Sequence, residues 1–340
     1  MKFLLAPIAW IYGFVVWLRN LLYDDHILHS TQVSIPTICV GNLAVGGTGK
    51  TPMAEYLISL LSSDYKVALL SRGYGRKTKG FRIANEHDTA QTIGDEPMQI
   101  HTHFPDIPVA VCADRVKGVK RLQQLYPDLQ CVILDDAYQH RKLRCGFYVL
   151  LTPYDCLYTN DHLLPWGRLR DLPSQSHRAN VVVVTKCPSQ MQPIDRRIVS
   201  NALHLASYQH LVYSSIGYAP IALNGTPLLV TGIANPLPLL EHLKAQYPDT
   251  ELLAFPDHHV FTKQNIAQIT QKAAQYSCVV TTEKDYMRLL QTPLVEQLGN
   301  KLQVLAIQTD LGIDKEAFDR QILLYVSENN RKLSTVNCPS

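Results

Sequence analysis

Short apolar runs alternate with segments of helical periodicity through the first part of the chain. Residues 33–40 form an apolar run that leads into a glycine-rich turn, and residues 51–61 continue with apolar positions at helical spacing. Further strand-like runs lie at 66–70, 109–112, 131–136, 147–151 and 181–185, and residues 115–126 again have helical spacing. Strands that alternate with helices form parallel sheets covered on both faces, so the pattern predicts an α/β fold.

The pattern changes at residues 211–223, where short extended pieces (LVYSSIGYAPIAL) predict a β-hairpin or a linker. A second series follows, with strand-like runs at 228–231, 252–255, 278–282 and 303–308. From about residue 329 the chain is polar, and we expect it to be loosely held. The predicted organisation is an N-terminal helix (1–22), a larger core (23–210), a hairpin linker (211–223) and a smaller α/β subdomain (224–330).

The N-terminal segment 3–18 has no charged residue. As a helix it would be roughly 24 Å long, shorter than the ~30 Å hydrocarbon core of a bilayer. A cleaved signal peptide, a buried helix and a membrane-inserting or interfacial helix are the alternatives. Trp10, Tyr12 and Trp17 suit a membrane interface, where one end of the ring is wet. We therefore expect a membrane-associating helix.

Composition narrows the function classes. The 340 residues are 46% hydrophobic and 18% charged, which is typical of a globular protein, and the net charge of +3 is too small for a dedicated nucleic-acid binder. None of the eight cysteines forms a CxxC pair, so reduced thiols are expected rather than a zinc site or disulfides. No feature indicates a stable protein partner.

The most informative motif is GGTGKT, at residues 46–51, between a predicted strand and a predicted helix. In this context backbone amides surround phosphate oxygens, a lysine neutralises their charge, and a hydroxyl binds Mg²⁺. Ala44 stands where the full phosphate-loop pattern has glycine. The predicted phosphate-binding residues are Ala44, Val45, Gly46, Gly47, Thr48, Gly49, Lys50 and Thr51.

Carboxylates in three other places suit phosphoryl-transfer chemistry. Asp135 and Asp136 end an apolar strand, and either could hold Mg²⁺. The alternative is a purely structural role in a turn or as a helix cap. Asp95 and Glu96, between Gly94 and Pro97, form either a capped helix start or a general base for an acceptor hydroxyl. In Asp257-His258-His259 a histidine could assist such a base, although a loop histidine is the commoner reading.

Arginines near predicted strand ends could stabilise the charge of a transferring phosphoryl group. Each alone is more often a surface ion-pair partner. The candidates are Arg72, Arg76, Arg115, Arg168 and Arg170.

Taken together, the strings GNLAVGGTGKTP, SRGYGRK, GDEP, ADR, DDAYQH, LLPWGRLRD and FPDHH resemble the tetraacyldisaccharide 4′-kinase family of lipid A biosynthesis, from about residue 4 to about residue 290. The resemblance implies ATP-dependent phosphorylation of the 4′-hydroxyl of a tetraacyl-disaccharide 1-phosphate. It also implies a peripheral or monotopic protein at the cytoplasmic face of the inner membrane, with two α/β subdomains around a cleft.

The resemblance also implies roles for single residues. Lys50 and Thr51 would serve phosphate and Mg²⁺, Asp95 would be the catalytic base, and His258 would be its partner. Asp135, Asp136 and Asp171 are further metal candidates, although Asp171 stands where the family has glutamate. Substrate or transition-state contacts are implied for Glu96, Arg72, Arg115, Gln139, His140 and Arg170.

Two rival functions remain open: a membrane-associated switch NTPase, and a nucleotide-binding module without lipid transfer. The switch class would need an NKxD motif or a metal-binding CxxC pair, and the sequence contains neither.

Overall fold

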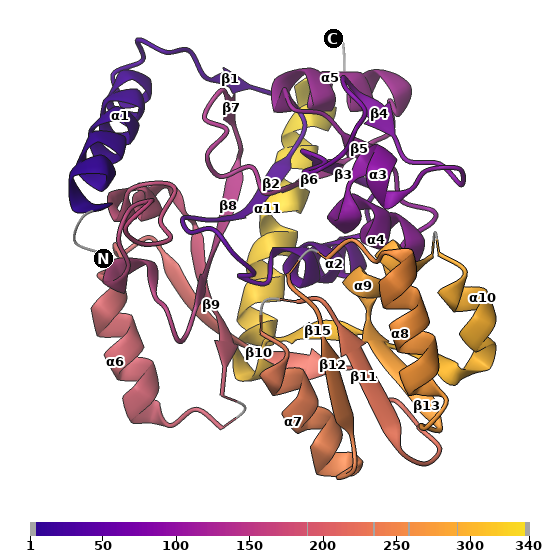
Figure 1. Ribbon diagram of the computed structural model, residues 1–340. Coiled ribbons are helices and arrows are strands. Elements are labelled where there is room, and N and C mark those ends of the chain that lie inside the picture. The colour runs from indigo at the N-terminus through magenta and orange to yellow at the C-terminus, as the bar shows by residue number, and fades with distance from the viewer. Residues whose placement is uncertain (1–4, 189, 234, 258, 291, 337–340) are drawn as a thin grey trace.

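Two separate sheets with helices around them form the frame of the chain (Figure 1). The computed structural model describes residues 5–188, 190–233, 235–257, 259–290 and 292–336, with side chains to residue 332. Within these residues there are a nine-stranded sheet, a four-stranded sheet and a two-stranded ribbon of β1 (Thr31–Gln32) and β7 (Leu143–Arg144). The α/β architecture with parallel sheets is as predicted.

The larger sheet is parallel except at its two edges. Its central strands pair in parallel because helical or loop connections return the chain to the same end of the sheet each time. In spatial order its strands are β15 (Ile307–Asp310), β10 (His210–Tyr218), β9 (Val181–Cys187), β8 (Phe147–Pro153), β2 (Thr37–Asn42), β6 (Cys131–Asp135), β3 (Val67–Ser71), β5 (Val109–Val111) and β4 (Arg82–Ile83).

The smaller sheet is parallel throughout the described residues. Its order is β12 (Glu251–Ala254), β11 (Pro227–Thr231), β13 (Cys278–Thr282) and β14 (Leu302–Leu305).

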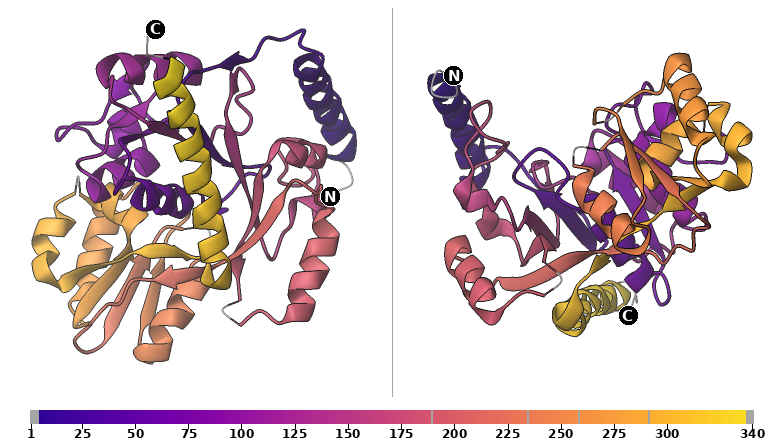
Figure 2. Two further views of the ribbon diagram at one scale, coloured as in Figure 1. Left: turned by 180° about the vertical axis from the view of Figure 1, so that it is seen from behind. Right: turned by 60° about the horizontal axis from the view of Figure 1, so that its bottom comes forward.

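The helices cover both faces of each sheet (Figures 1 and 2). They are α1 (Ala6–Asp24), α2 (Lys50–Leu61), α3 (Ala90–Ile93), α4 (Asp95–His103), α5 (Arg115–Leu125), α6 (Pro193–Leu203), α7 (Leu237–Gln246), α8 (Lys263–Ala273), α9 (Glu283–Leu289), α10 (Leu294–Leu298) and α11 (Lys315–Val336).

Each face of the larger sheet has its own hydrophobic core. Along β2, Ile38 and Val40 belong to one core and Cys39 to the other, because successive strand side chains point to opposite faces. Helices α2 and α11 contribute to the first core, and α5 and α6 to the second. Full burial of such apolar side chains stabilises the fold by about 1.5–3 kcal/mol each. We call the larger sheet with these helices the large lobe, and the smaller sheet with α7–α10 the small lobe.

The hairpin predicted at 211–223 is not formed, whereas residues 219–223 do lie in the connection between the large and the small sheet. β10 occupies most of this range and pairs in parallel with β9, with Leu211 opposite Val182. Its other neighbour is β15, nearly a hundred residues away in the sequence, so no local pattern could reveal the pairing. The predicted strand at 303–308 is also two strands, because the chain leaves the small sheet after β14 and enters the large sheet as β15.

The prediction that the chain is loosely held from about residue 329 is likewise wrong for the described residues. Helix α11 continues to Val336 and buries Phe318, Ile322 and Val326 in a core of the large lobe. The amide of Asn330 donates to the backbone oxygen of Gln130 at 3.3 Å. The end of the predicted small subdomain therefore packs against the large sheet.

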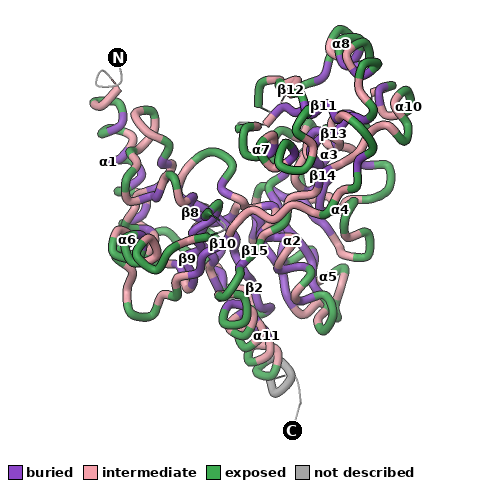
Figure 3. The backbone as a smooth tube through the Cα atoms, turned by 90° about the horizontal axis from the view of Figure 1, so that it is seen from below, coloured by how far each residue is buried: buried purple, intermediate pink, exposed green. Residues whose placement is uncertain are grey.

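Helix α1 lies at the outer edge of the large lobe, on the side away from the small lobe (Figures 1 and 2). Its inward positions are the small or polar residues Ala9, Gly13, Val16 and Asn20, spaced at helical intervals. Its outward positions are large and apolar, with Trp10 71% exposed, and Figure 3 shows exposed and buried positions alternating along the helix. Among the described residues no helix has both the length and the apolar character needed to cross a bilayer.

Candidate active site

The glycine-rich turn connects the buried strand β2 to helix α2, at the carboxyl ends of the parallel strands. Gly46 and Gly49 have φ values of +109° and +88°, which side chains rarely adopt. A Cβ atom added at Gly46 or Gly47 would meet nothing within 4 Å. The turn is thus open to solvent on one side, at the edge of the sheet where α/β proteins bind ligands.

Neighbouring strands hold the turn in place through polar side chains. Asn42 donates from Nδ2 to Oγ1 of Thr48 at 2.8 Å, and the Thr185 hydroxyl donates to the backbone oxygen of Thr48 at 2.9 Å. Ala44 forms a β-bridge with Leu169, next to the segment that carries Arg170. Ala44 at this position therefore makes an ordinary backbone contact, and the turn is fixed before any ligand arrives.

Asp135 ends β6 and is 1% exposed. Ser71 donates its hydroxyl to Oδ2 at 3.1 Å, whereas Oδ1 is buried and has no hydrogen-bond partner among the described residues. Burial, together with the carboxylates of Glu96 and Asp136, raises the pKa of Asp135 to about 7. A buried carboxylate oxygen without a donor is costly, and a cation would relieve that cost.

Asp136, the next residue, is surrounded by cations. It has a φ of +49°, which an aspartate tolerates better than most residues. Arg170 donates to both carboxylate oxygens, and Nζ of Lys50 lies 3.9 Å from Oδ1. Burial raises the pKa of Asp136, but the Arg170 hydrogen bond and the Lys50 charge outweigh it and hold the pKa below its usual value. Of the two aspartates, Asp135 therefore has the environment that better suits a metal ligand.

Arg115, Gln139 and His140 support the backbone around these aspartates. The buried Arg115 guanidinium donates to the backbone oxygens of Cys112, Ala113 and Asp136. Gln139 donates from Nε2 to the backbone oxygen of Asn42 at 2.7 Å. Burial and the Arg115 charge lower the pKa of His140 to about 4, and its Nε2 accepts from the Arg115 amide at 3.3 Å.

The other predicted arginines differ in what they contact. The candidate Arg72 is exposed. Arg76 donates to the backbone oxygen of Gly80, and Arg168 pairs with Asp161. Within the predicted arginine set, Arg170 binds the Asp136 carboxylate, whereas Arg115 contacts only the backbone oxygen of Asp136.

Asp171, a predicted metal candidate, has partners of another kind. Its Oδ1 accepts from Nδ2 of Asn20 in α1 at 2.8 Å, and its Oδ2 lies 3.7 Å from a guanidinium nitrogen of Arg178. Tyr12 of α1 also donates to the backbone oxygen of Arg170 at 2.9 Å. These contacts give Asp171 a role in docking α1. Its buried Oδ2 has no hydrogen-bond partner among the described residues, and the metal role stays a prediction.

The predicted base and its neighbour begin helix α4 and face the small lobe. Oδ2 of Asp95 accepts from Nε and Nη2 of Arg288 at 3.0 and 2.8 Å. Glu96 pairs with Lys284 at 3.2 Å. Both cations come from α9, and sequence reasoning missed them. The available signal was the run TTEKDYMR, in which a predicted strand is followed directly by charged residues. The predicted partner His258 lies outside the described residues.

Comparison with known proteins gives a consistent result. The family model for tetraacyldisaccharide-1-P 4′-kinase matches residues 1–327. The tetraacyldisaccharide 4′-kinase of Flavobacterium johnsoniae is 44% identical, covering 96% of this chain and 97% of that protein; the one of Bacteroides thetaiotaomicron is 42% identical, covering 97% and 94%. The crystal structure of LpxK from Aquifex aeolicus in complex with ATP has a TM-score of 0.74 at 25% identity, covering 96% of this chain and 99% of that one. The chain therefore belongs to the tetraacyldisaccharide-1-P 4′-kinase family.

Proposed function

We propose that the chain transfers the γ-phosphoryl group of ATP to the 4′-hydroxyl of a tetraacyl-disaccharide 1-phosphate, the reaction for which its family is named. The observation that carries the proposal is the open glycine turn beside Asp135. Amides and Lys50 suit a triphosphate, and a buried carboxylate oxygen without a donor suits the cation that accompanies it.

Mg²⁺ fits the residues at this edge of the sheet. Asp135 and the buried Thr51 offer hard oxygen ligands, whereas Asp136 is already neutralised by Arg170 and Lys50. When bound, the ion would offset the negative charge of the phosphate oxygens. Lys50 and Arg170 would stabilise the charge that spreads over the transferring phosphoryl group.

Asp95 is the proposed general base. Its carboxylate takes the proton of the sugar hydroxyl as the hydroxyl oxygen bonds to the γ-phosphorus, and the bond to the bridging oxygen of ADP breaks. Arg288 holds one oxygen of this carboxylate through two donors, which fixes its orientation. Because Arg288 belongs to the small lobe, the base is oriented only when the two lobes are together. Closed lobes would also exclude water, which limits loss of ATP by hydrolysis.

We further propose that α1 binds the cytoplasmic face of the inner membrane through its apolar side. Exposed large apolar side chains are costly in water, and α1 carries several at adjacent positions: Ile8, Trp10, Ile11, Phe14, Val15 and Trp17. The acyl chains of the substrate would then stay in the bilayer while the sugar enters the site.

A lipid-kinase assay tests the function. Purified protein is given γ-labelled ATP, Mg²⁺ and tetraacyl-disaccharide 1-phosphate in detergent micelles, and the label is followed in lipid and in free phosphate. We expect label in the lipid, and a fall of about 10²- to 10⁴-fold in turnover for Asp95→Asn with ATP binding retained. Release of free phosphate alone would instead support a switch NTPase, and near-normal turnover of Asp95→Asn would show that the base is another group.

A flotation assay tests the membrane face. Triple replacement of Trp10, Ile11 and Phe14 by serine should reduce binding to anionic phospholipid vesicles by more than about 10-fold, since each buried apolar side chain contributes about 1.5–3 kcal/mol. Replacing the exposed Ile194 and Ile198 of α6 by serine is the control. Equal flotation of the triple variant and the unmodified protein would contradict the assignment.

A further inference from the structure

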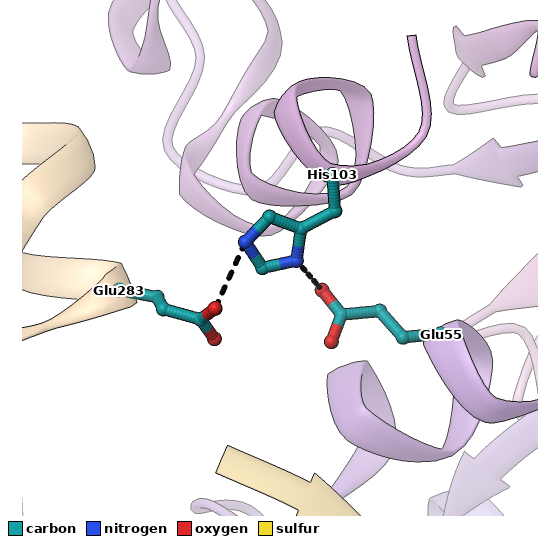
Figure 4. Close-up of side chains that lie close together, drawn as sticks. All are labelled: Glu55, His103 and Glu283. Carbon is teal, nitrogen blue, oxygen red and sulfur yellow. Dashed lines mark hydrogen bonds and ion pairs between the residues drawn. The ribbon is translucent and has the colours of Figure 1, made fainter. Parts of the chain in front are cut away.

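Three ionisable side chains from three helices meet where the lobes join (Figure 4). Nδ1 of His103, at the end of α4, lies 3.0 Å from Oε1 of Glu55 on α2. Nε2 of the same ring lies 2.9 Å from Oε1 of Glu283 on α9. We call this group the clasp. It joins the helix that follows the glycine turn, the helix that begins with the proposed base, and a helix of the small lobe.

A buried amide strengthens the clasp. Gln99 lies one turn before His103 on α4, and its Nε2 is 3.0 Å from Oε1 of Glu55 and 3.2 Å from Oε2 of Glu283. The side chains of Glu55 and Glu283 are 13% and 9% exposed. Two carboxylates therefore share two donors from one face of α4, with little water to screen their mutual repulsion.

The ring geometry favours a protonated histidine over a metal ion. The three side chains could offer ligand atoms within 4.8 Å of one another. However, the two ring nitrogens point in opposite directions, each at a different carboxylate (Figure 4). An ion can take only one of these nitrogens, whereas an imidazolium donates through both. A single imidazolium between the two carboxylates also offsets one of their two negative charges.

The clasp belongs to a charge pattern that runs the length of α4. At the start of α4, Asp95 meets Arg288; at its end, His103 meets Glu283. With Glu96 and Lys284 between them, these pairs tie α4 to α9 at three places and favour one register between the helices. Helix α9 is itself fixed to the small sheet, because Oδ2 of the buried Asp285 accepts from Thr231, Gly232 and Thr282.

We propose that His103 is a positioning residue, whose charged ring ties α2 to α9 and so places the Arg288–Asp95 pair relative to the glycine turn. The proposal rests on the proposed function, in which Asp95 accepts the proton. Glu55 lies one helical turn after Thr51, so a shift at the clasp reaches the phosphate-binding end of α2 directly. With His103 removed, two poorly screened carboxylates would face each other across the lobe junction and push α9 away.

The matched variants separate charge from shape. His103→Leu removes both donors, whereas His103→Arg keeps the positive charge and can donate to two carboxylates. We expect His103→Leu to lower kcat about 10-fold or more, with a smaller change in the KM for ATP, and His103→Arg to remain within about 3-fold of the unmodified protein. When Glu55→Gln and Glu283→Gln are already present, His103→Leu should lower kcat less, because the two side chains no longer repel each other. His87→Gln, in an exposed pair with Glu86, is the control.

Hydrogen exchange provides a readout that does not need the lipid reaction. In the full-length protein, His103→Leu should speed amide exchange in α9 and at the start of α4, while exchange in β11 stays unchanged. Unmodified exchange and kcat in a folded His103→Leu variant would overturn the proposal, as would equal defects in the leucine and arginine variants. Zn²⁺ binding that requires His103 would also overturn it. If the unmodified protein fails to phosphorylate lipid, the proposed function fails, and the exchange result still decides whether the clasp joins the lobes.

Discussion

The glycine turn and the α4–α9 junction hold charge in different ways. At the turn, the groups that would bind ATP and Mg²⁺ in the proposed function belong to residues 44–51 and to the strand ends beside them. Asp135 there keeps one buried oxygen without a donor. At the junction the carboxylates of Asp95, Glu96 and Glu283 each have a cationic partner on another helix. The turn is thus prepared for a ligand, and the junction is satisfied by the protein itself.

The two regions also differ in whether their geometry depends on the position of the small lobe. The turn is fixed within the large lobe, so its shape does not depend on where the small lobe lies. The orientation of Asp95 does depend on the small lobe, because Arg288 is carried by α9. We therefore expect changes at the turn to lower turnover more than changes to the cations of the junction do.

Apart from replacement of the proposed base itself, the largest effect is expected at the turn. Lys50→Ala removes the charge next to Asp136 and, in the proposed function, the cation on the phosphates. We expect turnover to fall by about 10³-fold, as for loss of one strong transition-state contact, with an almost unchanged melting temperature. The measurement is single-turnover transfer from γ-labelled ATP.

The control for this prediction is Lys315→Ala, at an exposed ion pair with Asp319 on α11. Its turnover should match that of the unmodified protein. Normal turnover of Lys50→Ala would contradict the expected difference, because a lysine at the turn would then matter no more for turnover than one on the surface.

The two regions also differ in how far the sequence predicts them. The sequence predicts the position of the turn between its strand and helix, because that pattern spans only a few residues. The same is true of the two aspartates at the end of β6. The fold class follows for the same reason. The arrangement of the junction depends on helices almost 200 residues apart, as between Asp95 and Arg288.

Predictions failed where partners lie far apart in the chain. The pattern of residues 211–223 suggests a hairpin, but β10 pairs with β9 and with the distant β15 instead. The contact between Asp171 and Asn20 on α1 is likewise not foreseen, because the two residues are 151 positions apart. A local sequence pattern shows which residue types are present, but it does not identify the distant side chains that will contact them in the fold.

A smaller effect is expected when Arg288 is replaced. Arg288→Gln removes the two donors to Asp95 and the contact to Asp285, so the proposed base loses its fixed orientation. We expect kcat to fall about 10- to 100-fold, with little change in ATP affinity, because the turn lies in the other lobe. Both are measured by steady-state kinetics over a range of ATP concentrations.

Arg320→Gln, which breaks an exposed pair with Glu316, is the matched control. A loss of ATP affinity equal to the loss of kcat would show that the junction and the turn act as one unit. The comparison would then need to be abandoned.

The smallest effect is a pH dependence of stability that comes from His103. Its hydrogen bonds to Glu283 on α9 and Glu55 on α2 raise the pKa of the ring to about 10, against the opposing effect of burial. When the pKa of a basic group is higher in the folded than in the unfolded protein, its protonation stabilises the fold. This stabilisation is fully present below the pKa of the unfolded protein, about 6.5 for histidine, and is lost as the pH rises through the pKa of the folded protein. The stability difference between the unmodified protein and His103→Leu should therefore shrink from about pH 7 to about pH 9.5. We expect a change on the order of 1 kcal/mol, because solvent screens a partly exposed ring. Urea unfolding of both proteins at the two pH values measures it, and groups that titrate in both proteins cancel in the difference. A difference that stays constant over this range would mean that the packing of the ring, rather than its charge, holds α4 against α2 and α9.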